Sequence, residues 1–193
     1  MGTMALFIGR FQPFHRGHLD AVREIEKQIL ARGGDGEIVF VIGRPVCQGP
    51  AGLGRDYRHL WGFEEVKRMI QDSCEEIRTP LHFILAPDLG VPERYQEYIL
   101  GLVGKAFPGN RSTRVVFSGN NETLNCFRIF THELTIHPMF LHGTEIRLMI
   151  LSDILGLGTD CWRNHVTKGS EKFLSSWVDD RKRGRNVTSD TNI

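Results

Sequence analysis

The residues whose types and spacing are best suited to chemistry lie at 9–18, a segment that reads Gly-Arg-Phe-Gln-Pro-Phe-His-Arg-Gly-His. This segment follows an apolar run at Met4–Ile8, and an apolar stripe with helical spacing begins at Leu19 directly after it. The pattern predicts a buried strand, a tight glycine turn that carries His15 and His18, and the start of a helix. The unpaired backbone N–H groups and partial positive charge of a helix start suit a phosphate, so chemistry on a nucleotide is the first interpretation.

Two histidines at this spacing could instead form half of a metal site. A complete site would need further ligands, and no cysteine or carboxylate cluster lies near His15 and His18 in the sequence. Two surface histidines without a role are another alternative. The concentration of glycine, proline and arginine in the same short turn favours a binding function over both.

A second candidate segment lies at 142–147, His-Gly-Thr-Glu-Ile-Arg, and opens another apolar-striped stretch that reaches Leu155. Thr144 is expected to cap this helix, and Glu145 lies in the first turn, where a carboxylate is favourable. Arg147 projects from the same turn, and a planar guanidinium can hold two phosphate oxygens at once. A capped helix start with an arginine is common by itself, but together with the first segment it indicates a phosphate site.

Around these segments, continuous apolar runs alternate with helical patterns, which predicts a parallel sheet covered by helices on both faces. The predicted strands are 5–9, 37–43, 81–86, 114–118 and, more weakly, 134–137. The predicted helices are 17–31, 63–77, 92–107 and 122–130, with Pro92 in a first turn. Ligands of such sheets collect at the carboxyl ends of the strands. The segments that fall at predicted strand ends are 9–18, 87–88 and 118–121.

One long connection, Arg44–Leu60, contains several prolines and glycines and also Arg55 and Arg58. Loops of this length without secondary structure are often lids over a site. The sequence leaves two interpretations open, namely an arginine-bearing flap over a triphosphate and a tolerated insertion.

The length of 193 residues suits one α/β domain, predicted over 1–180 and followed by a basic and polar C-terminal tail at 181–193. The 24 basic and 23 acidic residues nearly balance, so charge gives no case for nucleic acid or an anionic membrane as a partner. The four cysteines are dispersed, and no basic-then-apolar leader or membrane-spanning run is visible. These features predict a soluble cytoplasmic protein. They are compatible with a monomer and with a homo-oligomer.

The segment 9–18 resembles the H-x-G-H signature of the nucleotidyltransferase superfamily. Its Gly-Arg-Phe-Gln-Pro lead-in resembles most closely the archaeal-type nicotinamide mononucleotide (NMN) adenylyltransferases, and Gly143–Arg147 resembles their S-G-T-E-I-R element. Supporting matches follow in order at 87–89, 118–120, 138–140 and 160–162. The resemblance therefore covers roughly residues 4 to 165.

This resemblance implies a Rossmann-like nucleotidyltransferase domain that transfers the adenylyl group of ATP to NMN and forms NAD and pyrophosphate. It implies Mg²⁺ carried on the triphosphate, with no dedicated metal cage in the protein. The implied catalytic residues are His15, His18 and Arg147. The implied ATP-binding residues are Gly9, Arg10, Phe11, Gly17, Ser118, Asn120, Gly143, Thr144, Glu145 and Ile146. The implied acceptor-binding residues are Asp88 and Tyr95.

The chain departs from the family's pattern at three places. His142 stands where serine is usual, Tyr95 stands where a tryptophan is usual, and Trp61–Val66 replaces a Phe-Thr-x-Gly-Glu-Arg run. Two alternatives remain open from the residues. One is adenylyl or cytidylyl transfer to another phosphorylated acceptor, and the other is a sensor that binds a nucleotide without turnover.

Overall fold

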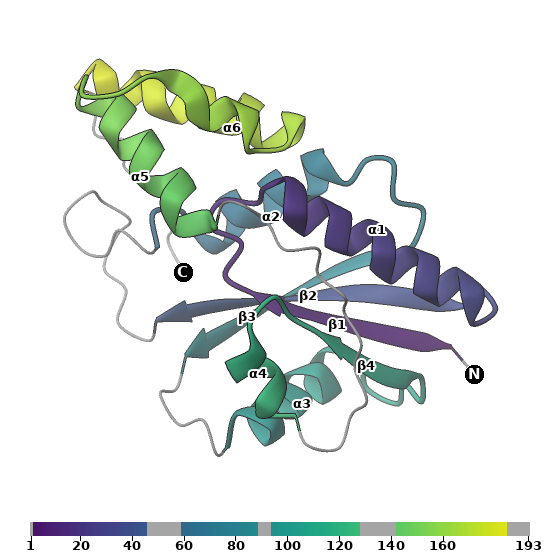
Figure 1. Ribbon diagram of the computed structural model, residues 1–193. Coiled ribbons are helices and arrows are strands. Elements are labelled where there is room, and N and C mark those ends of the chain that lie inside the picture. Colours follow the sequence, from purple (N-terminus) through teal and green to yellow (C-terminus); the bar gives the residue numbers. More distant parts are fainter. Residues whose placement is uncertain (1, 46–58, 89–93, 128–141, 185–193) are drawn as a thin grey trace. The chain divides into compact units, whose positions relative to one another are not determined.

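The computed structural model describes residues 2–45, 59–88, 94–127 and 142–184 (Figure 1). The chain divides into two compact units. The first, which we call the sheet unit, consists of Met1–Arg10, Asp20–Val46 and Glu76–His137. The second, the helical unit, consists of Phe11–Leu19, Cys47–Glu75 and Pro138–Ile193. The single domain predicted over 1–180, with its tail at 181–193, stays a prediction.

The sheet unit contains one parallel sheet with the strand order β3-β2-β1-β4. Its strands are β1 (Thr3–Gly9), β2 (Gly36–Pro45), β3 (Leu81–Asp88) and β4 (Thr113–Phe117). They arise from continuous apolar runs because a sheet covered on both faces needs no polar side. The four strands predicted for these segments are confirmed, while the fifth, 134–137, lies outside the described residues.

Helices cover both faces of this sheet, as predicted. α1 (Arg16–Ala31) lies on one side, and α3 (Tyr95–Ala106) and α4 (Asn121–Asn125) lie on the other (Figure 1). The central strand β1 is buried along nearly its whole length, so it has no polar face. The core that α3 covers includes Met4, Leu6 and Ile8 of β1 with Ile99 and Val103 of α3.

Several helices end at residues other than those predicted. α2 (Phe63–Ser73) stops four residues before the predicted end at Ile77. Shortly after that end, the backbone N–H groups of Arg78 and Thr79 donate to the Glu26 carboxylate at 2.8 and 2.9 Å, so these residues are held by a side chain. α3 begins later and α4 ends earlier than predicted, and Pro92 lies outside the described residues.

The helical unit contains α2, α5 (Gly143–Ile154), the short 3₁₀ helix η2 (Asp160–Asn164) and α6 (Lys168–Lys182). Its core includes the buried side chains of Trp61, Trp162 and Trp177, and the rings of Trp61 and Trp177 lie 5.3 Å apart. α6 packs closely on α2, because a Cβ atom added at Gly169 would lie 2.3 Å from the backbone carbon of Asp72. Among the described segments, no helix combines the length and the apolar character needed to cross a membrane.

Candidate active site

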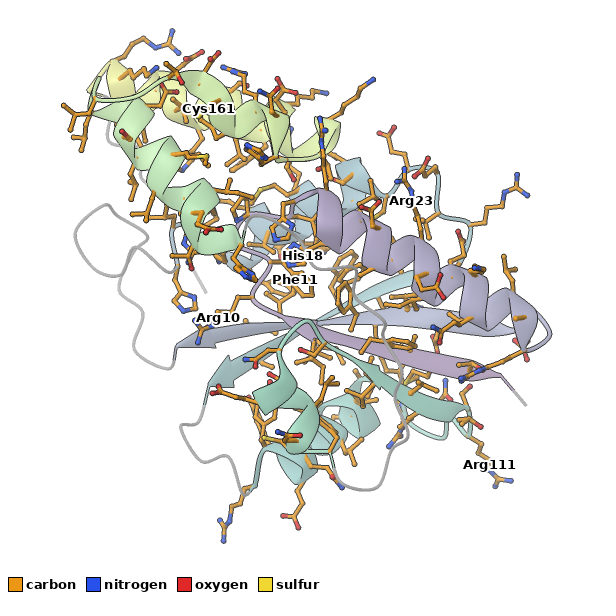
Figure 2. The ribbon with its side chains drawn as sticks, viewed as in Figure 1. Arg10, Phe11, His18, Arg23, Arg111 and Cys161 are labelled. Carbon is orange, nitrogen blue, oxygen red and sulfur yellow. The ribbon has the colours of Figure 1, made fainter. Side chains whose placement is uncertain are left out.

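The first motif begins at the carboxyl end of β1 and is divided between the units. Gly9 is the last residue of β1 and pairs with Ile42, and Arg10 after it is exposed (Figure 2). Phe11 opens the part of the motif that belongs to the helical unit. Its φ of 53° lies in the left-handed region, which is unusual for a bulky side chain and typical of a functionally constrained turn.

Aromatic rings surround His18 in the helical unit. The His18 ring lies edge-on to the ring of Phe11, with the two ring centroids 5.0 Å apart (Figure 2). It stacks against the ring of Phe14, with the centroids 5.4 Å apart. Both phenylalanines are buried. The imidazole therefore lies against an apolar wall, which removes water from one side of it.

The two motif histidines lie against each other as a stacked pair. Their ring centroids are 3.7 Å apart, and the backbone N–H of His15 donates to Nδ1 of His18 at 3.3 Å. Because Nδ1 of His18 accepts this hydrogen bond, a neutral His18 carries its proton on Nε2. Gly17 lies between the two histidines, half-buried in the first turn of α1. The pair thus offers an N–H donor at a defined atom.

Burial keeps both imidazoles neutral near pH 7. The pKa of His15 is lowered to about 4, first by burial and then by the positive charges of His142 and Arg147. The pKa of His18 also lies well below its usual value, because of burial and the neighbouring His15. Both rings can therefore donate an uncharged N–H, and each gains a proton more readily when an anion approaches.

A backbone segment between η2 and α6 holds the start of α1. His15 forms an antiparallel bridge with Val166, and the backbone N–H of Arg16 donates to the His165 carbonyl at 3.3 Å. Nε of Arg16 also donates to the Val166 carbonyl, at 3.2 Å. These contacts fix the backbone that presents the histidines. No side-chain pattern signals them, because the segment takes part through its backbone.

The second motif opens α5, but its cap is not the one predicted. His142 is the N-cap residue, and its backbone N–H donates to the carboxylate of Glu145. The prediction that Thr144 caps the helix is wrong, because the helix begins at Gly143 and Thr144 is its second residue. Thr144 is instead exposed in the first turn, and its hydroxyl accepts from Nη2 of Arg147 at 2.9 Å.

Arg147 joins the second motif to the first. Its side chain is buried, and Nη1 donates to the backbone carbonyl of Gln12. Gly143 faces the same carbonyl, since a Cβ atom there would lie 3.0 Å from the Gln12 oxygen and 3.4 Å from Nη1 of Arg147. Ile146 next to Arg147 is buried in the core. Two segments that are distant in the sequence therefore meet at one carbonyl group.

Gln12 is a further residue of the site, beyond those predicted from the sequence. Its buried side chain donates to the carbonyl of Trp61 at 2.8 Å and accepts from the backbone N–H of Trp61 at 3.1 Å. The residue thus connects both motifs to the segment that leads into α2. Burial of this amide is visible only in the structure, and its partners are backbone groups, so the sequence carries no signal for this role.

The remaining predicted residues belong to the sheet unit. Ser118 and Asn120 follow β4, where the buried hydroxyl of Ser118 accepts from the Asn120 N–H at 3.2 Å. The Asn120 side chain caps α4. Asp88 ends β3, and Tyr95 begins α3 with its ring edge-on to Phe127 at 6.0 Å. Tyr95 thus packs beside the core, and its contact with an acceptor stays a prediction.

One of the three arginines of the predicted flap lies among the described residues. Arg44 belongs to β2, whereas Arg55 and Arg58 lie outside the described residues, as does most of the predicted flap. In the part of the chain that the structure describes, no three His, Cys, Asp or Glu side chains gather into a group that could hold a metal ion.

Comparison with known families and proteins supports the resemblance. Residues 6–96 match the family described as cytidylyltransferase-like. The nicotinamide-nucleotide adenylyltransferase of Thermococcus sibiricus is 27% identical over 176 residues, covering 88% of this chain and 81% of that protein. The enzyme of the same name from Pyrobaculum aerophilum is 28% identical over 179 residues, covering 89% of this chain and 87% of that protein.

Solved structures show the same fold. The bifunctional NMN adenylyltransferase/ADP ribose pyrophosphatase from Francisella tularensis, complexed with AMP and Mn ion, matches 95% of this chain with a TM-score of 0.65 and 19% identity. This chain covers 52% of that larger protein. The Plasmodium falciparum nicotinic acid mononucleotide adenylyltransferase matches 93% of this chain with a TM-score of 0.55 and 11% identity. The chain thus has the Rossmann-like fold of the nucleotidyltransferases and resembles the archaeal NMN adenylyltransferases over most of its length, as its motifs predict.

Proposed function

We propose that this protein transfers the adenylyl group of ATP to NMN, producing NAD and pyrophosphate. The meeting of the two motifs at the Gln12 carbonyl carries the proposal, because it brings Arg147 and the start of α5 to the turn that bears the histidines. Each of these elements suits phosphate oxygens. The names of the curated relatives agree with the same reaction.

The reaction needs no covalent intermediate on the protein. A 5′-phosphate oxygen of NMN attacks the α-phosphorus of ATP in line, and a new P–O bond forms. The bond from the α-phosphorus to the bridging oxygen breaks, and pyrophosphate leaves with that electron pair. Catalysis then consists of positioning the two phosphates and offsetting the charge that develops on their oxygens.

The chain's own groups divide this work. The Nε2–H of His18 and the imidazole of His15 donate to non-bridging oxygens of the reacting phosphates, and these bonds strengthen as charge develops. Arg147 supplies a permanent positive charge, because its guanidinium is not deprotonated in proteins. Its hydrogen bonds to the Gln12 carbonyl and to the Thr144 hydroxyl hold the charge in place before ATP arrives.

Further roles follow from the resemblance. Gly9, Arg10 and Gly17 would admit and bind the triphosphate, and Ser118 and Asn120 would contact adenosine. Mg²⁺ would arrive bound to ATP and keep most of its waters, as this ion does on nucleotide triphosphates. Asp88 and Tyr95 would recognise the nicotinamide end of the acceptor.

A turnover assay tests the proposal. Purified protein is incubated with ATP and Mg²⁺ and, in turn, with NMN, nicotinic acid mononucleotide, phosphopantetheine or glycerol 3-phosphate. Pyrophosphate and the dinucleotide product are then measured. NAD should form with NMN. Pyrophosphate release only with another acceptor, or only with CTP, would establish the alternative reaction, adenylyl or cytidylyl transfer to another phosphorylated acceptor. ATP binding without turnover would establish a sensor.

A further inference from the structure

A buried carboxylate, Asp153, lies in the last turn of α5 and belongs to neither motif. Its side chain is only 7% exposed, yet both of its oxygens are hydrogen-bonded. Oδ2 accepts from Nε1 of Trp162 at 3.0 Å, and Oδ1 accepts from Nζ of Lys182 at 2.7 Å. A buried charge is tolerated only where it is paired and hydrogen-bonded. Asp153 therefore joins α5, η2 and α6 at one point.

Trp162 is the member of this group that leads toward the histidines. Its side chain is fully buried, and the Arg163 guanidinium lies over its ring, 4.7 Å from the centroid. The indole N–H is the only polar group of the side chain, and Asp153 accepts it. The backbone carbonyl of Trp162 accepts from the N–H of His165 at 3.0 Å. Asp153 thus holds the indole in place, and with it the backbone that ends η2.

The backbone that follows η2 contacts the histidine turn directly. The His165 carbonyl accepts from the backbone N–H of Arg16 at 3.3 Å, and the Val166 carbonyl accepts from Nε of Arg16 at 3.2 Å. Val166 also forms the antiparallel bridge with His15. A movement of the Trp162 indole would therefore be passed to the backbone of His15 and Arg16 within four residues of the chain.

We propose that Asp153 is a positioning residue for the reaction, which acts through Trp162 and the backbone at 165–166 to hold His15 and His18 where the phosphates react. This role rests on the proposed function and adds to it a residue that touches no substrate. It requires the hydrogen bond from Nε1 of Trp162, whereas the ion pair with Lys182 serves to keep the Asp153 carboxylate in place.

α5 is attached to the histidine turn at both of its ends. In its first turn, Arg147 donates to the Gln12 carbonyl, and in its last turn Asp153 supports His15 through η2. The two attachments together fix where the arginine and the histidines lie relative to each other. Catalysis by positioning depends on this geometry, and a displacement of about 1 Å far from the chemistry can lower the rate about 10²-fold.

Three variants test the role of Asp153. Asp153→Leu removes both acceptor oxygens, and Trp162→Phe removes the N–H but keeps an aromatic ring. Both should lower kcat roughly 10- to 100-fold and change the KM values of ATP and NMN much less, because they displace groups that act on the transition state. Asp153→Asn keeps an acceptor for Trp162 and loses the ion pair with Lys182, so it should retain most of the wild-type kcat. The double variant Asp153→Leu/Trp162→Phe should lose no more than either single variant, because both break the same hydrogen bond.

Nitrogen NMR of the His18 imidazole gives a measurement that does not depend on turnover. Nδ1 of His18 accepts from the backbone N–H of His15, so its ¹⁵N chemical shift reports the geometry of the turn. The shift should change in Asp153→Leu and Trp162→Phe and stay at the wild-type value in Asp153→Asn. Leu174→Ala is the matched control, because Leu174 is buried in α6 and has no polar side-chain group. This control should lower the melting temperature and leave both kcat and the His18 shift unchanged.

The outcomes separate the two proposals. Normal kcat in folded Asp153→Leu or Trp162→Phe overturns the inference. Equal losses of kcat in Leu174→Ala and Asp153→Leu also overturn it, because stability alone would then account for the effect. A lower kcat with an unmoved His18 shift overturns it as well, because the histidine turn would not be the route. If Asp153→Leu does not fold, Trp162→Phe and Asp153→Asn decide by the same measurements. If no NAD forms with NMN but the shift moves in Asp153→Leu and not in Leu174→Ala, Asp153 positions the turn and the proposed reaction is wrong.

Discussion

His15 is buried, and Nδ1 of His18 accepts a hydrogen bond from the His15 backbone, so the two rings differ in how they can act on a phosphate. Their lowered pKa values make them neutral donors in the unliganded protein. A bound phosphate offsets the cost of protonation, so the same rings can become charged when the substrate is present. The two imidazoles therefore interact most strongly with the phosphate oxygens that carry the most negative charge.

Replacing His15 by alanine should lower kcat about 10²–10³-fold, by analogy with the loss of one donor to a developing oxyanion. His18→Asn should give a similar loss. Asparagine is the better choice at this position because the His18 ring packs on Phe14, and alanine would leave a gap there. Thermal denaturation of each variant is the control. Near-normal kcat in a folded variant would exclude a catalytic role for that histidine.

The lowered pKa of His15 also predicts how stability depends on pH. A base whose pKa falls on folding binds protons more tightly in the unfolded chain, so protonation favours unfolding. The contribution of His15 to the free energy of unfolding is therefore complete above pH 6.5 and is lost as the pH falls toward about 4. The loss for His15 should reach about 3 kcal/mol of unfolding free energy. Denaturant titrations at pH 7 and pH 4 measure it. His15→Gln should have a smaller difference between the two pH values, and an unchanged difference would contradict the assignment to His15.

Tyr95 provides the test of acceptor recognition. If its ring stacks on the nicotinamide cation, Tyr95→Leu should raise the KM of NMN by roughly 2- to 30-fold, as loss of a cation–π contact predicts, and leave the KM of ATP nearly unchanged. Tyr95→Trp should bind NMN as well or better. Loss of thermal stability with an unaltered KM for NMN would show that the contact with Phe127 is the whole role of the ring.

The packing of α6 on α2 depends on close backbone approach. A side chain at Gly169 would collide with the backbone of Asp72 and Ser73, at 2.3 to 2.5 Å from an added Cβ atom. Because α6 and α2 are in such close contact at Gly169, moving them apart at this residue would also break the contacts beside it. These contacts include the hydrogen bond between the hydroxyls of Ser73 and Thr167, at 2.5 Å.

Gly169→Ala should therefore lower the free energy of unfolding by about 1–3 kcal/mol, as overpacking of a tight interior does. Gly101→Ala is the matched control, because Gly101 lies in α3 and nothing lies within 4 Å of its added Cβ atom. This control should stabilise the protein by about 0.5–1 kcal/mol through helix propensity. Denaturant unfolding measures both, and equal effects would contradict the packing argument.

The elements differ in how far local sequence predicts them. The spacing of apolar residues predicts the strands and α1 to within a few residues, because the same spacing places these side chains on the buried faces of the folded protein. α6 is not among the predicted helices, although Leu174, Trp177 and Val178 have helical spacing and Thr167 caps the helix. The bond from Arg147 to Gln12 spans 135 residues and uses a carbonyl that every residue type has, so no sequence signal exists for it.

Magnesium and ATP should act on the stability of the whole protein as well as on turnover. A ligand that binds only the folded state at 100 times its Kd adds about 2.7 kcal/mol to the free energy of unfolding. MgATP should therefore raise the melting temperature. Chelation with EDTA should reduce this shift and abolish NAD formation, and added Mg²⁺ should restore both. An equal shift with ATP in EDTA would show that the metal has no part in binding.

The bridge from His15 to Val166 has a consequence for how the protein is made. Nε of Arg16 donates to a carbonyl 150 residues later in the chain, so the histidine turn is synthesised early and receives its backbone partner late. At ordinary ribosomal rates of about 5–20 residues per second, the interval is roughly 8–30 s. A nascent chain can pair its strands in that time, but it cannot complete the turn. Ribosome-bound chains arrested before residue 166 should therefore lack ATP affinity, whereas full-length chains arrested on a C-terminal linker long enough to bring residue 166 out of the exit tunnel should possess it.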